Sequence, residues 1–180
     1  MSSWYEVVEG ESLEQGDILR RCDVPIVSSV DDDEVEYDLV AMDVVVMTQS
    51  CDLANDKVDH VLLARAAAWA DVVAEERQRG NGAAASSTFR QSLVRGDAVN
   101  LSLLHERPEA PEFPWSVVDF RRLVSIPKSL AVLWAAQQGP RLRLVPPYRE
   151  NLAQAFARYF MRVGLPHAAH GFLEAFAKGK

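Results

Sequence analysis

The sequence comprises 180 residues with a formal net charge of −7, and 48% of its residues are hydrophobic and 25% are charged. This composition is typical of a globular domain with a core of its own, and it excludes a chain that is disordered throughout. The two cysteines, the lack of a charged-then-apolar leader and the lack of an apolar run of roughly 18 residues predict a reduced, cytoplasmic protein without membrane contact.

The first part of the chain predicts short strands joined by turns. Residues 4–13 are a polar lead, and residues 15–17 (QGD) are typical of a turn that enters a strand. Pro25 lacks a backbone donor, so its segment is restricted to an edge strand or an extended stretch. The acidic block 31–34 predicts a solvated hairpin loop, although four carboxylates could also attract a divalent cation. The strands expected here are 18–21, 24–28 and 35–41.

We expect the fold to be organised around residues 42–67. The continuous apolar run 44–47 (VVVM) predicts a strand that is covered on both faces. Five small or polar residues follow at 48–52 (TQSCD), and a return strand is expected at 60–64. If the two strands pair as a hairpin, the polar loop and the start of the return strand lie at the same end of the sheet.

Beyond residue 67, short helices interrupt the predicted strands. The spacing of apolar residues at 69–76 predicts a helix that ends near Gly80, and a second helix capped by Ser86 or Ser87 should end at Gly96. Residues 82–87 are expected to be a mobile loop, and the prolines at 108–114 cannot join a ladder. The other elements expected are strands at 99–105, 115–126 and 141–145 and a short helix at 130–138.

A longer helix is predicted near the C-terminus, at residues 149–163. Its apolar residues recur every three or four positions, and Gly164 and Pro166 provide a stop signal. A short amphipathic tail at 167–178 follows. We expect Leu152, Phe156 and Phe160 to pack on strand 44–47 or on its neighbour.

The polar loop and the return strand suggest a cysteine-dependent catalytic site. Cys51 would be the nucleophile, with a depressed thiol pKa, His60 would be the base and Asp52 would orient it. The expected binding residues of the same loop are Thr48, Gln49 and Ser50. Alternatively, Cys51 is a small buried residue and Asp52 a turn former.

A zinc site at this loop is a further alternative. Cys22, Cys51, Asp52 and His60 could together hold a zinc ion. No CxxC pair supports such a site, so we expect neither a metal nor another cofactor.

Charge is distributed unevenly along the chain. Residues 1–85 carry 6 Lys or Arg against 19 Asp or Glu, whereas residues 86–180 carry 13 against 7. Either one domain mixes and pairs these charges, or the second half presents a basic face to phosphates. Arg149, Arg158 and Arg162 are the expected nucleic-acid contacts in the second case. A further hypothesis is that Arg149 pairs with Asp52 and so joins the C-terminal helix to the polar loop.

Two resemblances can be drawn from these segments. Residues 15–18 (QGDI), 44–53 (VVVMTQSCDL) and 148–166 (YRENLAQAFARYFMRVGLP) together resemble a widespread bacterial family, a resemblance that implies no activity. A second resemblance rests on the succession of residues 16–18, a loop, residues 44–50, a polar loop with Asn55, and residues 61–64. This succession is similar to the opening of the PemK/MazF-type barrel of toxin ribonucleases. Residues 42–43 replace the Arg-Pro step of those toxins and 66–68 replace their Ser/Thr, so the resemblance implies their fold but not their ribonuclease activity.

The sequence therefore predicts an α+β protein of one domain, residues 1–180. It comprises a small, strongly curved SH3-like (PemK/MazF-like) β-barrel at about 15–145, a helical insertion at 68–96 and the C-terminal helix packed on the barrel.

The expected function is that of a non-catalytic interaction or regulatory component of a bacterial multi-gene system, with a protein partner or a second copy as ligand. A nucleic-acid-binding or RNA-processing module and a cysteine-dependent enzyme are the alternatives. Trp4, Tyr5, Trp115 and Trp134 would be interaction anchors if they are exposed, and core residues if they are not.

Overall fold

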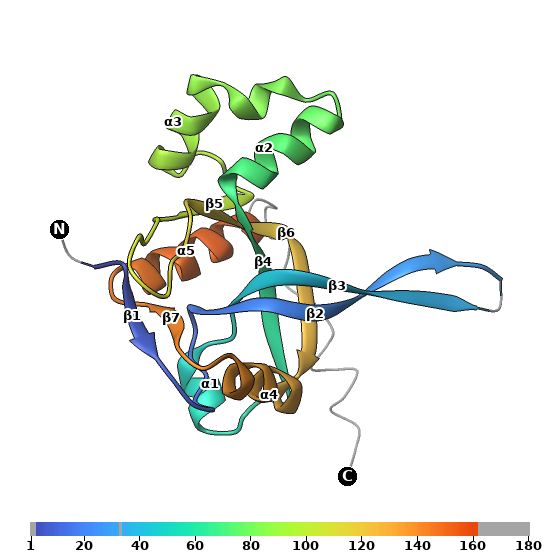
Figure 1. The fold of residues 1–180 in the computed structure, drawn as a ribbon, viewed down its shortest axis with the longest axis vertical. Coiled ribbons are helices and arrows are strands. Elements are labelled where there is room, and N and C mark those ends of the chain that lie inside the picture. The colour runs from blue at the N-terminus through green and yellow to red at the C-terminus, as the bar shows by residue number, and fades with distance from the viewer. Residues whose placement is uncertain (1–2, 33, 162–180) are drawn as a thin grey trace, which may run out of the picture.

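The computed structural model describes residues 3–32 and 34–161. They form a curled antiparallel half-barrel, a seven-stranded sheet in the order β1-β7-β2-β3-β4-β6-β5 (Figure 1). The strands are β1 (Tyr5–Val8), β2 (Asp17–Val30), β3 (Val35–Val46), β4 (His60–Ala68), β5 (Leu101–Leu104), β6 (Ser116–Pro127) and β7 (Arg141–Leu144). The α+β class and the strong curvature of the sheet are therefore confirmed.

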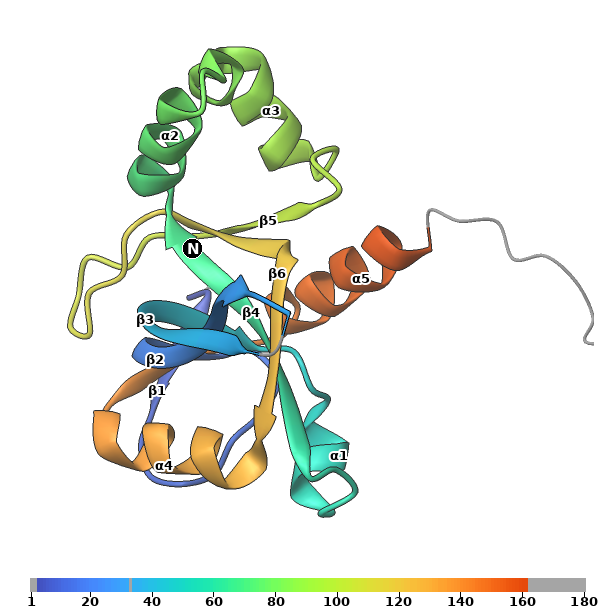
Figure 2. The same cartoon turned by 90° about the vertical axis from the view of Figure 1, so that its right-hand side faces the viewer.

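Six helical segments accompany the sheet within the described residues. They are α1 (Ser50–Ala54), α2 (Trp69–Gln78), the 3-10 helix η1 (Gly82–Ala85), α3 (Ser87–Arg95), α4 (Lys128–Gln138) and α5 (Tyr148–Phe160). Figure 2 shows α2 and α3 at one end of the molecule and α4 at the opposite end. None of the described helices has the length and apolar character needed to cross a bilayer.

The last residues of the central strand β3, Val44 to Val46, are buried on both faces, as the apolar run predicts. Val45 belongs to a core cluster that includes Leu152 of α5, whereas Val44 and Val46 belong to a second cluster that includes Ala131 of α4. Side chains alternate between the faces of a strand, so neighbouring valines contact different helices. Helices α4 and α5 thus cover opposite faces of the same strand.

The helical insertion forms a small cluster of its own over β5. The rings of Trp69 in α2 and Phe89 in α3 stack with centroids 6.1 Å apart. Ser86 caps α3 by accepting a 3.1 Å hydrogen bond from the backbone N–H of Phe89, and Gly96 ends the helix with a φ of 72°. Both ends of α3 therefore follow the signals in the sequence.

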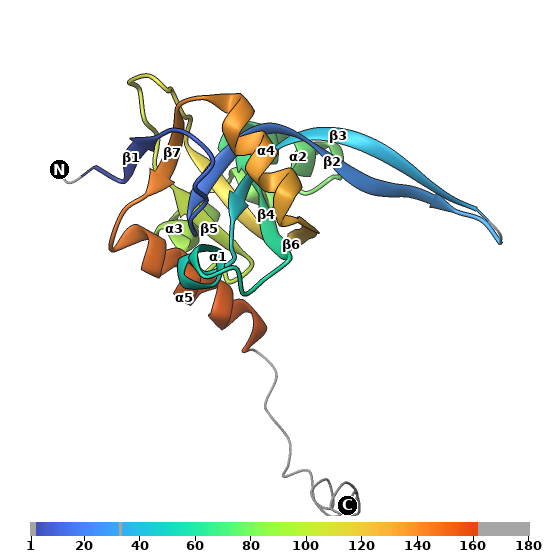
Figure 3. The same cartoon turned by 90° about the horizontal axis from the view of Figure 1, so that it is seen from below.

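Strands β2 and β3 extend beyond the sheet as a two-stranded arm, defined here as residues 25–39. Figures 1 and 3 show the arm projecting from the body of the molecule. Strand β7 pairs with β2 only at Asp17 and Ile18, and β4 pairs with β3 only from Asp43 onward, so among the described strands none pairs with the outer side of the arm. This one-sided pairing explains why Pro25 is tolerated there.

Three expectations about elements are wrong or incomplete. The lead at 4–13 contains strand β1, which pairs with β7 from Tyr5 to Val8. The segment expected to be a loop at 82–87 contains η1 and the start of α3. Helix α5 ends at Phe160, and the predicted cap at Gly164 and the tail at 167–178 lie outside the described residues.

Candidate functional site

The polar loop, residues 48–52 (TQSCD), runs into helix α1 at Ser50 and is held by hydrogen bonds to its neighbours. The hydroxyl of Thr48 accepts a 2.7 Å hydrogen bond from the backbone N–H of Leu62, and the hydroxyl of Ser50 accepts a 3.1 Å bond from that of Gln15. The Gln15 side chain also donates to the carbonyl of Met47 at 2.9 Å. Thr48 and Ser50, which we expected to bind a ligand, are therefore engaged in fixing the loop.

The three residues of the expected catalytic site do not form a nucleophile-base pair. Cys51 is exposed in α1, where its thiol donates to Gln49 Oε1 at 3.6 Å and to Asp52 Oδ1 at 3.7 Å. His60 starts β4 at the same end of the sheet, opposite Pro127 of β6. Among the described residues, His60 makes no hydrogen bond with Cys51 or Asp52, so the hydrogen-bonded chain that such a site needs is missing.

A hollow of about 480 Å³ lies beside Cys51. Lys128 enters it and donates to the carbonyl of Leu53 at 2.7 Å and to Asp56, whose carboxyl pKa is lowered by that hydrogen bond and by the lysine charge. Within residues 3–32 and 34–161 no cluster of three His, Cys, Asp or Glu side chains could hold a metal ion. Cys22 is buried on β2 near the arm, and burial raises the pKa of its thiol to about 12.

Arg149 pairs with an unexpected carboxylate. Its guanidinium donates to Glu14 at 3.2 Å and to Glu150 at 3.2 Å, so the hypothesis of an Arg149–Asp52 pair is wrong. The connection between α5 and the polar loop exists, but it passes through residues 14 and 15, because Gln15 bonds Ser50 and Glu14 bonds Arg149. The segment before β2 was not expected to have this role.

A buried ionic cluster, which we did not predict, lies at the same place. Asp17 is fully buried and accepts hydrogen bonds from Arg141 at 3.1 Å and from Arg143 at 3.0 Å. Burial disfavours the charged guanidinium of Arg143, but hydrogen bonding and charge attraction to Asp17 outweigh it and raise the pKa of Arg143. The alternation of residues 141–144 (RLRL) was a signal, since it places both arginines on one face of a strand.

The arginines that we expected to contact nucleic acid make contacts within the protein where the structure describes them. Arg158 donates to the backbone carbonyl of Gly96. Arg162 lies outside the described residues. Arg149 and Arg158 therefore serve contacts within the protein.

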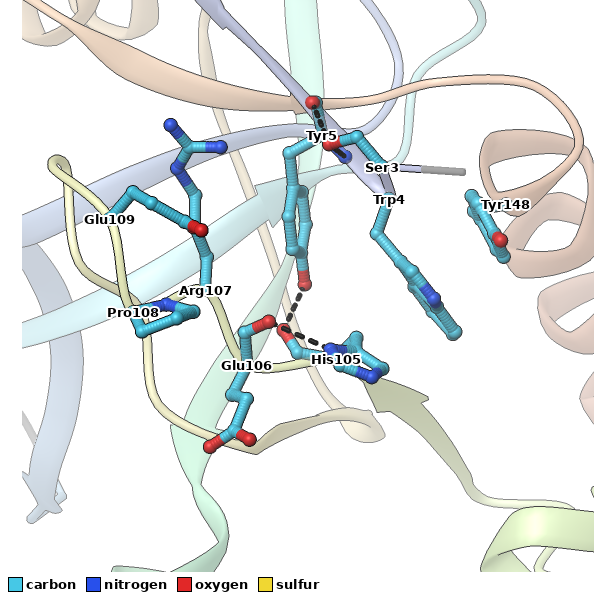
Figure 4. Close-up of a pocket in the computed structure, with 9 residues that line it drawn as sticks. All are labelled: Ser3, Trp4, Tyr5, His105, Glu106, Arg107, Pro108, Glu109 and Tyr148. Atoms are coloured by element: carbon cyan, nitrogen blue, oxygen red, sulfur yellow. Dashed lines mark hydrogen bonds between the residues drawn. The ribbon is translucent and has the colours of Figure 1, made fainter. Parts of the chain in front are cut away.

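Aromatic side chains gather around a hollow of about 740 Å³ between β1 and the segment after β5 (Figure 4). Trp4 stacks on Tyr148 with ring centroids 4.0 Å apart, and the ring centroids of His105 and Trp115 are 4.2 Å apart. The hydroxyl of Tyr5 donates to the carbonyl of His105 at 2.6 Å, and burial raises the pKa of that hydroxyl. Trp115 is exposed, Tyr5 is buried, and Trp4 and Trp134 are partly buried, so Trp115 alone fits the expected exposed anchor.

The arm presents an apolar face to solvent. Directly opposed residues of a ribbon share a face, as do alternate residues of one strand. The opposed pairs Pro25–Leu39, Val27–Tyr37 and Val30–Val35 therefore lie on one face. Tyr37 is 65% exposed and Leu39 70% exposed. Acidic and apolar residues alternate in residues 34–39 (EVEYDL), and this alternation indicates one apolar face. The exposure of that face was not expected.

Comparison of the chain with protein-family models, with curated proteins and with solved structures gives no match. The function is therefore argued from the structure, in which the arm exposes apolar side chains and the polar loop is fixed by internal hydrogen bonds.

Proposed function

We propose that this protein is a non-catalytic interaction component that binds a protein partner through its β2–β3 arm. The observation that carries the proposal is the exposed apolar face of the arm, formed by Pro25, Val27, Val30, Val35, Tyr37 and Leu39. A contiguous apolar surface of this kind is typical of a protein-protein interface. The arm adds no packing to the body of the molecule, so folding alone gives no reason for its apolar side chains.

The charge of the arm favours a protein partner over nucleic acid. Glu36 and Asp38 lie on the face opposite Tyr37, and Asp31, Asp32 and Glu34 surround the tip. These carboxylates would be repelled by phosphates, whether in nucleic acid or in an anionic membrane. A protein surface with apolar and basic groups matches both faces of the arm.

The geometry of the polar loop gives less support to the enzyme alternative. Cys51 and His60 share no hydrogen bond, and Thr48 and Ser50 are occupied by backbone donors. The nucleic-acid alternative is weakened in the same way, because Arg149 is paired with carboxylates. In the proposal, the loop is a structural junction between the segment before β2, the sheet and α5.

The proposal includes a finer description of the fold and setting. We regard the curled sheet as an SH3-like, PemK/MazF-like barrel from which the β2–β3 hairpin has grown into an arm. Its order of a turn, a buried central strand, a polar loop and a return strand supports this relation. We place the protein in a bacterial multi-gene system, where an interaction component without chemistry of its own has a role.

Photo-crosslinking in cells tests the docking role of the arm. A benzoylphenylalanine residue would replace Tyr37, and the matched control would carry it in place of Leu133, which is 49% exposed on α4. We expect discrete protein adducts from position 37 that are lost when Val35→Glu and Leu39→Glu are added, and that persist with Cys51→Ser. Equal adducts from positions 37 and 133 would contradict the proposal.

A further inference from the structure

We infer that the arm binds a second copy of this chain, in the groove between α3, β5 and α5. The inference rests on the proposed function, because it names the partner of the arm. The groove has a volume of about 640 Å³ and is lined on its apolar side by Leu93, Val94, Leu103, Trp115 and Ala155. It lies next to the aromatic hollow and shares Trp4, His105 and Tyr148 with it.

The groove and the arm have complementary charge. Arg95 and Arg158 are the charged residues that line the groove, and no Asp or Glu lines it within the described part of the chain. Arg95 pairs with the exposed Asp97 at 2.9 Å, whereas Arg158 donates to a backbone carbonyl and pairs with no described carboxylate. The exposed carboxylates at the tip of an incoming arm, Asp31, Asp32 and Glu34, would supply a partner for the Arg158 charge while the Tyr37 face lies along the groove.

The apolar parts also correspond. The arm offers Tyr37 and Leu39 on one face, and the groove offers an exposed indole at Trp115 and an exposed aliphatic side chain at Val94. Residues 25–30 of β2 span about 20 Å at roughly 3.3 Å per residue. This length allows the arm to reach along the groove of another copy while its own body stays outside.

The arm cannot fill the groove of its own chain. Figures 1 and 3 show the arm on the side of the molecule away from α3 and α5. Each copy therefore carries a donor element on one side and an acceptor groove on the other. Such a head-to-tail contact builds a ring or an open chain of copies rather than a symmetric pair.

Two variants separate donor from acceptor. Tyr37→Glu with Leu39→Glu disables the arm, and Val94→Glu with Arg158→Glu disables the groove. Tyr37, Leu39 and Val94 are each at least 65% exposed, and Arg158 is exposed, so both variants are expected to fold. Leu133→Glu, at another exposed apolar position, controls for the added charge.

The measurement is the mass of the purified full-length protein by light scattering over a range of concentrations. Wild type and Leu133→Glu should grow beyond the 20.0 kDa protomer as concentration rises. Each double variant alone should stay a monomer. Their equimolar mixture should reach twice the protomer mass and no more, because only one arm and one groove remain functional.

Several outcomes would overturn the inference. A mixture that remains monomeric, or a groove variant that assembles like wild type, would show that the arm does not use this groove. Binding of a labelled single-stranded oligonucleotide that the groove variant loses, without any assembly of wild type, would assign the groove to nucleic acid instead. In these cases adducts from position 37 to another protein in cells would still support the proposed function, whereas no adducts would contradict both.

Discussion

Asp17 shows how a single side chain fixes the start of β2. It is fully buried, and it receives hydrogen bonds from Arg141 and Arg143 of β7. The same arginines also donate to backbone carbonyls of the preceding segment, at Gly10 and Ser12. A charge removed from water is tolerated only where partners of this kind surround it.

Asp17→Asn is predicted to destabilise the protein by about 3 kcal/mol, because two guanidinium groups lose their buried counter-charge. The control is Asp23→Asn on the same strand, where the side chain is exposed and the change should stay within about 0.5 kcal/mol. Urea denaturation of the purified variants measures both. Equal losses at the two positions would mean that the ionic cluster adds nothing beyond the effect of an exposed charge.

Glu75 gives a pH dependence with a defined sign. Hydrogen bonds from Arg65 lower the pKa of its carboxyl below the ordinary 4.5. The stabilisation is therefore fully present above pH 4.5 and is lost as the pH falls through the lower folded-state pKa. Since a third of the Glu75 side chain is exposed, we expect Glu75→Gln to cost at most about 1 kcal/mol at pH 7 and to flatten the acid side of the unfolding profile. An unchanged profile would count against this pair.

The two cysteines should differ in reactivity. Cys22 is buried and its thiol has a pKa of about 12, whereas Cys51 is exposed. Alkylation of the folded protein at pH 8 should modify one thiol, and Cys51→Ser should abolish that reaction while leaving a second thiol that reacts only after unfolding. Mass spectrometry counts the modified sites. Modification of Cys22 in the folded state would show that the β2 core opens.

At the residue level, the sequence predicted that the polar loop is linked to the C-terminal helix, but not which side chains make the link. The polar loop does lie at a strand end, and Arg149 does connect it to the C-terminal helix. Its true partner, Glu14, comes from a segment without periodicity, so no local pattern could select it over Asp52. The catalytic hypothesis for Cys51, Asp52 and His60 stays a prediction, and the contacts of Cys51 are with Gln49 and Asp52 rather than with His60.

Among the elements, α5 binds the half-barrel through the first part of its apolar stripe. Leu152 is buried in the cluster that contains Val45 and Met47, and Phe156 contacts Phe120 with ring centroids 5.5 Å apart. Phe160 is 55% exposed and touches Phe156 and Tyr159. The expected packing of α5 is confirmed for Leu152, whereas Phe156 packs on Phe120 of β6 rather than on β3 or its neighbour, and Phe160 is largely exposed.

Phe156→Ala is therefore predicted to lower the free energy of unfolding by about 2 kcal/mol, since a partly buried ring leaves a gap against Phe120. Phe160→Ala serves as the matched variant on the same helix, with an expected loss below about 1 kcal/mol. Thermal or urea unfolding of both proteins gives the comparison. A larger loss at position 160 would place the end of α5 against a surface that the exposed ring does not indicate.

Most elements could be predicted because their signals are local. Ser86 and Gly96 bound α3, and the valine run marks the buried part of β3. Strand β1 was missed because residues 5–8 (YEVV) are too few to give a clear pattern and gain their pairing from β7, more than 130 positions away in the sequence. The length of the arm was missed because the apolar residues of β2 and β3 were assigned to a barrel wall.

For the whole molecule, the opposite charges of the two halves are partly paired within the chain and partly left exposed on the arm. Glu14 and Asp17 of the first half pair with arginines of the second half, whereas the carboxylates of the arm face solvent. The proposed assembly through the arm should therefore weaken with salt, because added ions screen the attraction between exposed charges and the Debye length is only about 10 Å at 0.1 M. Between 0.05 and 0.5 M NaCl the Debye length falls roughly threefold. Light scattering at these two concentrations should show a lower mass at high salt. Growth of the assembly with salt would indicate a purely apolar contact.

The unpaired sides of the arm also bear on misassembly. A two-stranded ribbon with open edges is a template to which strands of other chains can add without limit. Pro25 has no backbone N–H to donate, and Asp31, Glu36 and Asp38 place negative charge along the ribbon. Proline and charged residues at such positions oppose the addition of further strands. Replacing the three carboxylates with their amides should leave the core of the half-barrel intact and yet make the protein prone to aggregate, so we expect the charge of the arm to serve solubility whatever the arm binds.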